Sequence, residues 1–288
     1  MKNLKNIFTL VALTLGLITS FAQQNDNSLL WKVEGNGIKT SYVFGTFHML
    51  PKKDFELQNK VTNALQNSEI LVLELDMDDP KMQTEMMQLS ALKDGKTLAE
   101  FMDAEEYTLI DTYLKEKMGM GLDSFKTFKP LLVSSMVMMG YLGADMASYE
   151  ASLITMAKEQ EKEIKGLETV AFQMGVFDEQ PYDEQLDEVV KLLKEKDVMK
   201  DMFNEMIALY KNENIEGLYD YMDDFFNGDQ AQLDRMLHAR NQNWIPKMSE
   251  YSKEQTVFYG VGAGHLGGTL GVVNLLREAG YIVTPVLE

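Results

Sequence analysis

Apolar and polar positions divide the chain into three zones, and each zone predicts its own kind of element. In the first zone, Ser28–Val33 and Thr40–His48 are strand-like runs joined by a glycine-containing turn, the pattern of a β-hairpin. Residues 55–68 carry apolar side chains at helical spacing, and Ile70–Asp76 is apolar on both faces. A strand with two apolar faces belongs inside a sheet that helices cover on both sides.

The other two zones complete the predicted fold. Residues 80–254 show mostly helical spacing, interrupted by one short strand-like run, Glu163–Glu168. Residues 256–288 predict a strand, a glycine loop, a helix and a final strand. No proline- or glycine-rich linker divides the sequence, so we expect a single domain over residues 23–288. We predict an α/β (α+β) fold whose central mixed β-sheet is built from both termini, with flanking helices and the large helical middle region packed across it.

The first 22 residues predict an export signal. Two lysines precede an uncharged apolar run, Ile7–Phe21, and Ser20 and Ala22 offer the small residues that a signal peptidase recognises. The run is shorter than the about 18 to 20 apolar residues that a membrane-spanning helix needs. We therefore expect cleavage, no stable membrane insertion afterwards, and a periplasmic or secreted protein.

Composition narrows the classes of function. The formal net charge of -18 disfavours binding to nucleic acid, whose phosphates such a surface repels. The chain has no cysteine, which rules out disulfides and a thiol nucleophile. It has 21 methionines. We interpret them as flexible filling for helical cores rather than as copper ligands, because no histidine accompanies their clusters.

Two copies of the pattern Gly-x-x-His supply the candidate chemistry. The chain has three histidines, and His48 and His265 each follow a strand-like run with a glycine three residues before them. Such a glycine lets backbone or ligand approach without a Cβ in the way. Neutral imidazole is also a common ligand for transition metals. The pair predicts a site assembled from the two ends of the sequence.

Acidic residues also fall at predicted strand ends. Glu74 ends the second strand and Glu168 the third, while the histidines end the first and follow the fourth. Ligands of open α/β sheets bind beyond the carboxyl ends of the strands. Two imidazoles and a carboxylate can hold a divalent first-row metal, and a buried arginine, for which Arg240 is the candidate, can hold developing negative charge.

Each residue also has a purely structural interpretation. His48 could be a hydrogen-bonded core histidine, and Glu74 and Glu168 could form buried ion pairs. Arg240 could cap or pair within its own helix, and His238 is expected at the surface. The glycine loop before the last helix matches a dinucleotide-binding fingerprint, but the acidic residue expected about 20 positions later coincides with the C-terminus, so we reject that match.

Five ordered segments together carry a family resemblance. They are Trp31 with Ser41–Leu50, Leu73–Asp76, Lys165–Thr169, Arg240-Asn241 and Val261–Leu266. From about residue 28 to the C-terminus the chain resembles the TraB/GumN family, which includes the TIKI proteases. The resemblance implies an active centre of two Gly-x-x-His histidines, a glutamate and an arginine. By motif these are His48, His265, Glu74 with Glu168 as a second carboxylate, and Arg240.

The resemblance also implies an activity. TIKI proteins are metal-dependent peptidases that prefer manganese or cobalt, and their fold is similar to erythromycin esterase and ChaN-like haem-binding proteins. We therefore expect an exported metal-dependent hydrolase acting on a peptide or protein, with Mn²⁺ or Co²⁺, or alternatively Zn²⁺, bound by His48, Glu74 and His265. Glu168 would be a ligand or general base, and Arg240 would steady the oxyanion. The alternatives are a non-catalytic haem- or metal-binding protein and an inactive module that binds a partner; the oligomeric state is left open.

Overall fold

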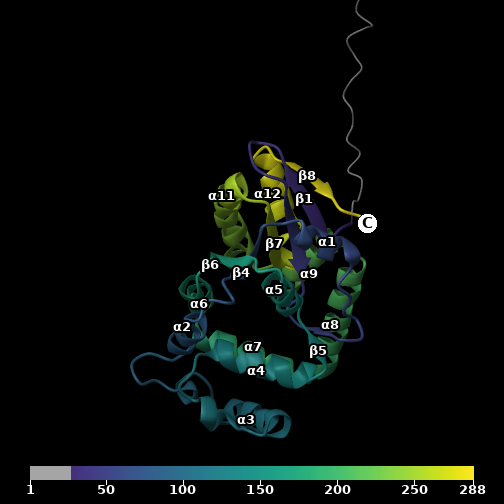
Figure 1. Ribbon diagram of the computed structural model, residues 1–288. Coiled ribbons are helices and arrows are strands. Elements are labelled where there is room, and N and C mark those ends of the chain that lie inside the picture. The colour runs from purple at the N-terminus through teal and green to yellow at the C-terminus, as the bar shows by residue number, and fades with distance from the viewer. Residues whose placement is uncertain (1–26, 227) are drawn as a thin grey trace, which may run out of the picture.

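The computed structural model describes residues 27–226 and 228–288 (Figure 1). The predicted export signal, residues 1–22, lies outside the described residues. Within them, helices surround one six-stranded sheet and one two-stranded sheet. The predicted α/β fold class with a mixed sheet is confirmed.

The large sheet joins both ends of the chain. Its strands lie in the order β6-β4-β7-β2-β1-β8. They are β1 (Leu30–Glu34), β2 (Ser41–Thr46), β4 (Ile70–Leu75), β6 (Glu163–Glu168), β7 (Val257–Gly262) and β8 (Ile282–Pro285). Strands β6, β4, β7 and β2 are parallel, whereas β1 pairs antiparallel with both β2 and β8. The parallel strands therefore present their carboxyl ends at one common edge.

Helices cover both faces of this sheet, as the two-sided apolar pattern of β4 predicts. On one face, Phe258 of β7 lies against Phe44 of β2, whose ring contacts Tyr149 in α5 (Tyr149–Glu159). Helix α1 (Asn59–Gln66) contacts β2 and β7. On the other face, Tyr259 donates a hydrogen bond to the carbonyl of Met248 in α11 (Ala239–Glu254), which packs against α12 (Val272–Glu278).

The helical middle region is only partly packed on the sheet, which corrects the expectation that all of it lies across. Helices α5 and α11 cover the sheet, but α3, α4 and α7 form a second apolar core of their own, seen below the sheet in Figure 1. The remaining elements are α2 (Met82–Leu89), η1 (Leu98–Glu100), α3 (Ala104–Met118), η2 (Leu122–Phe125), α4 (Pro130–Leu142), α6 (Val170–Asp178), α7 (Tyr182–Lys194), α8 (Lys196–Lys211), α9 (Ile215–Phe225), α10 (Gln230–Leu233), the π-helix η3 (Asp234–His238) and η4 (Ala263–His265).

Within the stretch of helical spacing, the segment from 182 to 211 is divided into α7 and α8 at Glu195 (φ -109°, ψ 43°). The two helices pack in different hydrophobic cores. Leu186 and Leu193 of α7 are buried in the second core, whereas Ile207 and Tyr210 of α8 are buried in the core around the sheet. The break lets one amphipathic stretch turn its apolar stripe from one core to the other.

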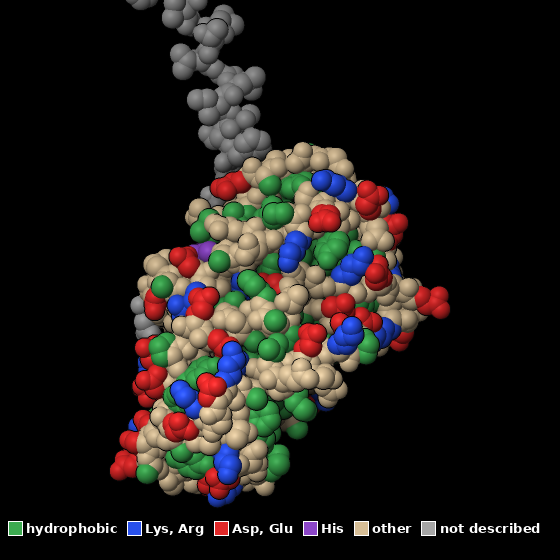
Figure 2. All heavy atoms as spheres, turned by 90° about the vertical axis from the view of Figure 1, so that its left-hand side faces the viewer, with side chains coloured by type: hydrophobic (Ala, Val, Ile, Leu, Met, Phe, Trp, Pro, Cys, Tyr) green, Lys and Arg blue, Asp and Glu red, His purple; other side chains and the backbone are tan. Residues whose placement is uncertain are grey.

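A two-stranded sheet links the chain after β2 to the middle region. It pairs β3 (Leu50–Pro51) with β5 (Met146–Ala147), two residues before α5 begins. In the part of the chain that the structure describes, no helix is long and apolar enough to cross a membrane. Acidic and basic side chains are interspersed over the face drawn in Figure 2, with apolar patches between them.

Candidate active site

Four residues predicted from the sequence lie at the same edge of the large sheet, because the strands that carry them are parallel. His48 follows β2, Glu74 lies one residue before the end of β4, and Glu168 is the last residue of β6. His265 ends η4, the short helix that follows β7. The structure therefore brings together residues from positions 48 to 265 at one end of the sheet.

A cavity of about 500 Å³ opens at this edge, bounded also by side chains of α4, α6, α8 and α9. Its polar lining consists chiefly of His48, Glu74, Gln173, Arg240 and His265. The rest of its wall is largely apolar and rich in methionine, namely Met49, Met138, Met206, Met222 and Met236. Methionine side chains are flexible and adapt to irregular shapes. The cavity therefore suits a ligand that places a bulky apolar group beside a polar reacting group.

Gly262, the glycine of the second Gly-x-x-His motif, is the point on which three side chains converge. A Cβ there would lie 3.3 Å from Oε1 of Glu74, 3.5 Å from Cδ2 of His265 and 3.6 Å from Nε2 of His48. The Gly262 N–H also donates to Oε1 of Glu74 at 2.8 Å. The motif thus supplies both a histidine and the open space in front of it. Gly45, in the first motif, instead allows the backbone at Ala263 to approach closely.

His265 is buried and held on every side. Its Nδ1–H donates to Oδ1 of Asn241 at 2.6 Å, and its ring lies 4.5 Å from that of Trp244. A guanidinium N–H of Arg240 points at Nε2 from 3.3 Å, so Nε2 carries the lone pair. Burial lowers the pKa of His265 to about 3. The imidazole is therefore neutral near pH 7, with a fixed tautomer.

His48 has the opposite surroundings. It lies in the loop between β2 and β3, and its side chain is 68% exposed. Its Nδ1–H donates to Oε1 of Glu150 at 2.7 Å. The hydrogen bond to Glu150 raises the pKa of His48 to about 9. Glu150 was missed in the sequence, where the only available signal was its place in the first turn of a helix after Ser148.

Arg240 is the centre of the charged network. Its Nη2 donates to Oε2 of Glu74 at 2.5 Å and to Oε2 of Glu168 at 3.0 Å, and its Nε donates to Glu168. Its Nη1 donates to the Met236 carbonyl and lies against Nε2 of His265. Burial opposes its charge, but the two carboxylates outweigh this effect and raise its pKa. Because these partners account for all five N–H groups, none is left free for the predicted oxyanion.

Glu168 lies behind Arg240 rather than in the cavity wall. It is buried, and besides Arg240 it accepts hydrogen bonds from Nε1 of Trp244 at 2.8 Å and from Gln173 at 3.0 Å. Gln173 also donates to Glu74 at 3.2 Å, so it joins the two carboxylates. Its carboxylate oxygens are thus engaged by Arg240, Trp244 and Gln173, and Glu168 is absent from the cavity lining. Gln173 carried no signal in the sequence.

Glu74 is the carboxylate that faces the cavity. Burial alone would raise its pKa, but the positive charges that His265 and Arg240 can carry outweigh burial and lower the pKa to about 2. Glu74 is therefore ionised near neutral pH. One oxygen is held by Arg240 and the other lies beside Gly262.

The predicted metal ligands do not form a ready coordination shell. Over the described residues, no three His, Cys, Asp or Glu side chains are arranged to hold a metal ion. Arg240 explains this, because its guanidinium already contacts both Glu74 and His265.

The chemistry of the donor set nevertheless fits a divalent first-row metal. Both histidines donate Nδ1–H to a fixed acceptor, His48 to Glu150 and His265 to Asn241. Such outer partners are what orient metal-binding histidines in proteins. Nε2 is therefore the remaining ring nitrogen of each histidine, and the Glu74 carboxylate lies with both rings around Gly262. A Cβ at Gly262 would close the space in front of this set.

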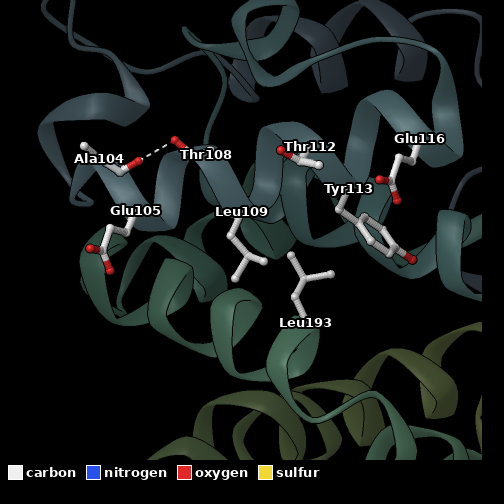
Figure 3. Close-up of a pocket in the computed structure, with 8 residues that line it drawn as sticks. All are labelled: Ala104, Glu105, Thr108, Leu109, Thr112, Tyr113, Glu116 and Leu193. Carbon is white, nitrogen blue, oxygen red and sulfur yellow. Dashed lines mark hydrogen bonds between the residues drawn. The ribbon is translucent and has the colours of Figure 1, made fainter.

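A second hollow, of about 570 Å³, lies on the middle region between α3 and α7. Figure 3 shows Leu109 and Leu193 facing each other with Tyr113 to one side, and Glu105 and Glu116 at either end. Its lining includes no histidine and no residue from the strand ends. The cavity at the sheet edge, rather than this hollow, is therefore the one lined by residues predicted from the sequence.

The fold and the site define an α/β protein with a centre of histidines and carboxylates at the carboxyl edge of its parallel strands. The chain belongs to the TraB/PrgY/gumN family, whose model matches residues 29–285, and the predicted resemblance is confirmed. It is similar to a zebrafish (Danio rerio) protein named metalloprotease TIKI1, at 21% identity over 325 residues. The alignment covers 93% of this chain and 65% of that relative. No solved structure matches the chain.

Proposed function

We propose that this protein is an exported metal-dependent hydrolase that cleaves peptide bonds. The observation that carries the proposal is the convergence of His48, Glu74 and His265 on Gly262 at the polar end of an apolar cavity. Membership of the family and similarity to a relative named a metalloprotease support it. The substrate would be a peptide or protein that places an apolar side chain in the methionine-rich part of the cavity.

The metal would be held by Nε2 of His48, Nε2 of His265 and the Glu74 carboxylate. Mn²⁺ or Co²⁺ is proposed, with Zn²⁺ as the alternative. When bound, such a metal supplies Lewis acidity, lowering the pKa of a water molecule and polarising a carbonyl group.

The protonation states of the three proposed ligands differ. His265 is neutral and Glu74 is ionised near pH 7, so neither has to lose a proton before it binds a metal. His48 has a pKa of about 9 and must release the proton on Nε2 first. Because a ligand must be deprotonated before it binds a metal, metal binding should strengthen as the pH rises from 6 toward 9.

Arg240 and Glu168 support this centre from behind. Arg240 fixes one oxygen of Glu74 and points at the lone pair of His265, while Glu168 holds Arg240 in place. We therefore propose that both residues set the position and charge of the ligands. This replaces the roles of oxyanion donor and general base that the sequence suggested.

Metal analysis and a cleavage assay test the proposal together. Wild type, His48→Ala, His265→Ala and His238→Ala would be loaded with Mn²⁺, analysed by mass spectrometry, and incubated with a peptide library. We expect the first two variants to lose bound metal and cleavage while remaining folded. His238→Ala is the matched control, because His238, which is buried and not at the surface as expected, is bonded to Tyr219 and Asp234 and is absent from the cavity lining.

The outcomes separate the candidate functions. Stoichiometric metal retained in both His48→Ala and His265→Ala would reject the site. Binding of metal or haem by the wild type without any cleavage would favour the non-catalytic binding protein.

A further inference from the structure

The two proposed histidine ligands are secured very differently, and the exposed one depends on a single side chain. His265 is 5% exposed and contacts Asn241, Arg240 and Trp244. The side chain of His48 is 68% exposed, and the hydrogen bond that fixes its ring comes from Glu150. Whatever orients Glu150 therefore orients His48.

Glu150 is itself firmly placed. It lies in the first turn of α5, where the helix dipole favours a carboxylate. The N-cap residue Ser148 accepts a hydrogen bond from the Ala151 N–H at 3.3 Å and donates its own hydroxyl hydrogen to Oε2 of Glu150 at 2.8 Å. Oε1 is left to accept from His48. The donor and the acceptor of each hydrogen bond in this series are therefore fixed. Because Glu150 can only accept, the ring hydrogen of His48 lies on Nδ1.

The backbone provides the matching register. Strands β3 and β5 pair Leu50 with Ala147 and Pro51 with Met146. Leu50 follows His48 by two residues, and Ala147 precedes Glu150 by three. The small sheet thus ties the histidine loop to the start of α5, so that its pairing sets the distance between the two side chains.

From this geometry we infer that Glu150 is the positioning residue for His48. Glu150 holds the ring so that Nε2 points toward Gly262, where a Cβ would lie 3.6 Å from it. The inference rests on the proposed function and adds a residue from the middle region that the family motifs do not contain. Removal of such an outer partner typically weakens metal binding or activity by about 10- to 100-fold.

Two substitutions separate the shape of Glu150 from its charge. Glu150→Gln keeps the size and an acceptor oxygen, whereas Glu150→Ala removes both. Asp234→Asn is a matched control, because Asp234 accepts from Nδ1 of His238 at 2.6 Å, the same kind of contact at a histidine outside the cavity lining. Thermal unfolding of each variant would show that it is folded.

The measurements are Mn²⁺ affinity by calorimetry and the ¹⁵N shifts of the imidazoles without added metal; with three histidines in the chain, the spectrum can be assigned by substitution. We expect Glu150→Ala to bind Mn²⁺ about 10- to 100-fold more weakly and to shift only the His48 resonances. Glu150→Gln should lie between it and the wild type. Asp234→Asn should shift the His238 resonances and bind Mn²⁺ normally.

Unchanged His48 resonances and unchanged Mn²⁺ affinity in both Glu150 variants would overturn the inference. His48→Ala, measured in parallel, distinguishes this failure from failure of the proposed function. If His48→Ala loses Mn²⁺ while the Glu150 variants do not, only the inference that Glu150 positions His48 is wrong. If His48→Ala binds Mn²⁺ like the wild type, the proposed metal site itself is wrong.

Discussion

The two Gly-x-x-His segments form the same motif but give their histidines opposite environments. The C-terminal segment buries His265 among Asn241, Trp244 and Arg240. The N-terminal segment leaves His48 mostly exposed at the cavity rim, bonded to Glu150. One half of the centre is thus built into the core around the sheet, and the other is attached to it through a loop.

The difference follows from what each segment joins. The segment after β7 continues into η4, which contacts α9 and is bonded to Asn241 of α11, so its buried polar atoms find partners inside the protein. The segment after β2 carries His48, whose side chain is 68% exposed, and leads to the small β3–β5 sheet. Three substitutions or conditions would break or sharpen this contrast.

The largest effect is expected from Arg240→Met. The substitution leaves Glu74 and Glu168 buried without their cation, and breaking a buried ion pair in this way typically costs about 3–5 kcal/mol. Urea unfolding of the wild type and the variant would measure the loss.

Arg235→Met is the control for this prediction. Arg235 lies 3.9 Å from Glu179, whose side chain is 63% exposed, and pairs of this kind contribute at most about 1 kcal/mol. An equal decrease in the free energy of unfolding in the two variants would show that the ion pairs of Arg240 contribute no more stability than an exposed pair.

The strand-end residues of the network around Arg240 could be predicted from the sequence, whereas the residues that support them could not. The parallel strands and their shared edge could be predicted because β4 is apolar on both faces and because polar residues stand at the strand ends. The second copy of the Gly-x-x-His motif then indicated that His48 and His265 would lie at the same site. These features depend on local periodicity and on general rules of sheet topology.

The supporting residues could not be predicted in the same way. Glu150 and Gln173 lie on helices with several other polar residues, and their spacing does not distinguish a buried partner from a solvated one. Their roles depend on tertiary placement, namely the β3–β5 pairing for Glu150 and, for Gln173, a position on α6 within hydrogen-bond distance of Glu74 and Glu168. That all five N–H groups of Arg240 have hydrogen-bond partners likewise follows only from the positions of those partners.

A smaller and more selective effect is expected from acid. The pKa of His265 is about 3 in the folded protein against an ordinary 6.5, so below pH 6.5 the unfolded chain binds this proton more readily. Stability from this residue is therefore present above pH 6.5 and is lost as the pH falls from 6.5 toward 3, by at most about 1.4 kcal/mol per pH unit. Glu74, with its pKa of about 2 against 4.5, adds a further loss only below pH 4.5.

Urea unfolding at pH 7, 5.5 and 4.5 would test this window. His265→Gln should be less sensitive to pH than the wild type between 7 and 4.5. His48→Gln should keep the wild-type loss of stability below pH 6.5, because the pKa of His48 is shifted in the opposite direction and its contribution is lost as the pH rises from 6.5 to about 9. A wild-type loss that persists in His265→Gln would mean that the buried imidazole does not cause the acid sensitivity.

The smallest effect on stability, with a large effect on binding, is expected from Gly262→Ala. The residue has φ -52°, which alanine adopts without strain, and its Cβ would meet side-chain atoms at 3.3–3.6 Å. The free energy of unfolding should change by less than about 1 kcal/mol. Mn²⁺ affinity should fall at least about 10-fold, because the methyl group fills the space between the two halves.

Gly267→Ala gives the opposite control for that experiment. A Cβ at Gly267 would lie 2.2 Å from the carbonyl oxygen of Ile215, so the backbone must move, at a cost of about 1–3 kcal/mol. Calorimetric titration with Mn²⁺ and urea unfolding of both variants would complete the comparison. If Gly262→Ala binds Mn²⁺ like the wild type, His265 and His48 do not bind the metal in the space in front of Gly262.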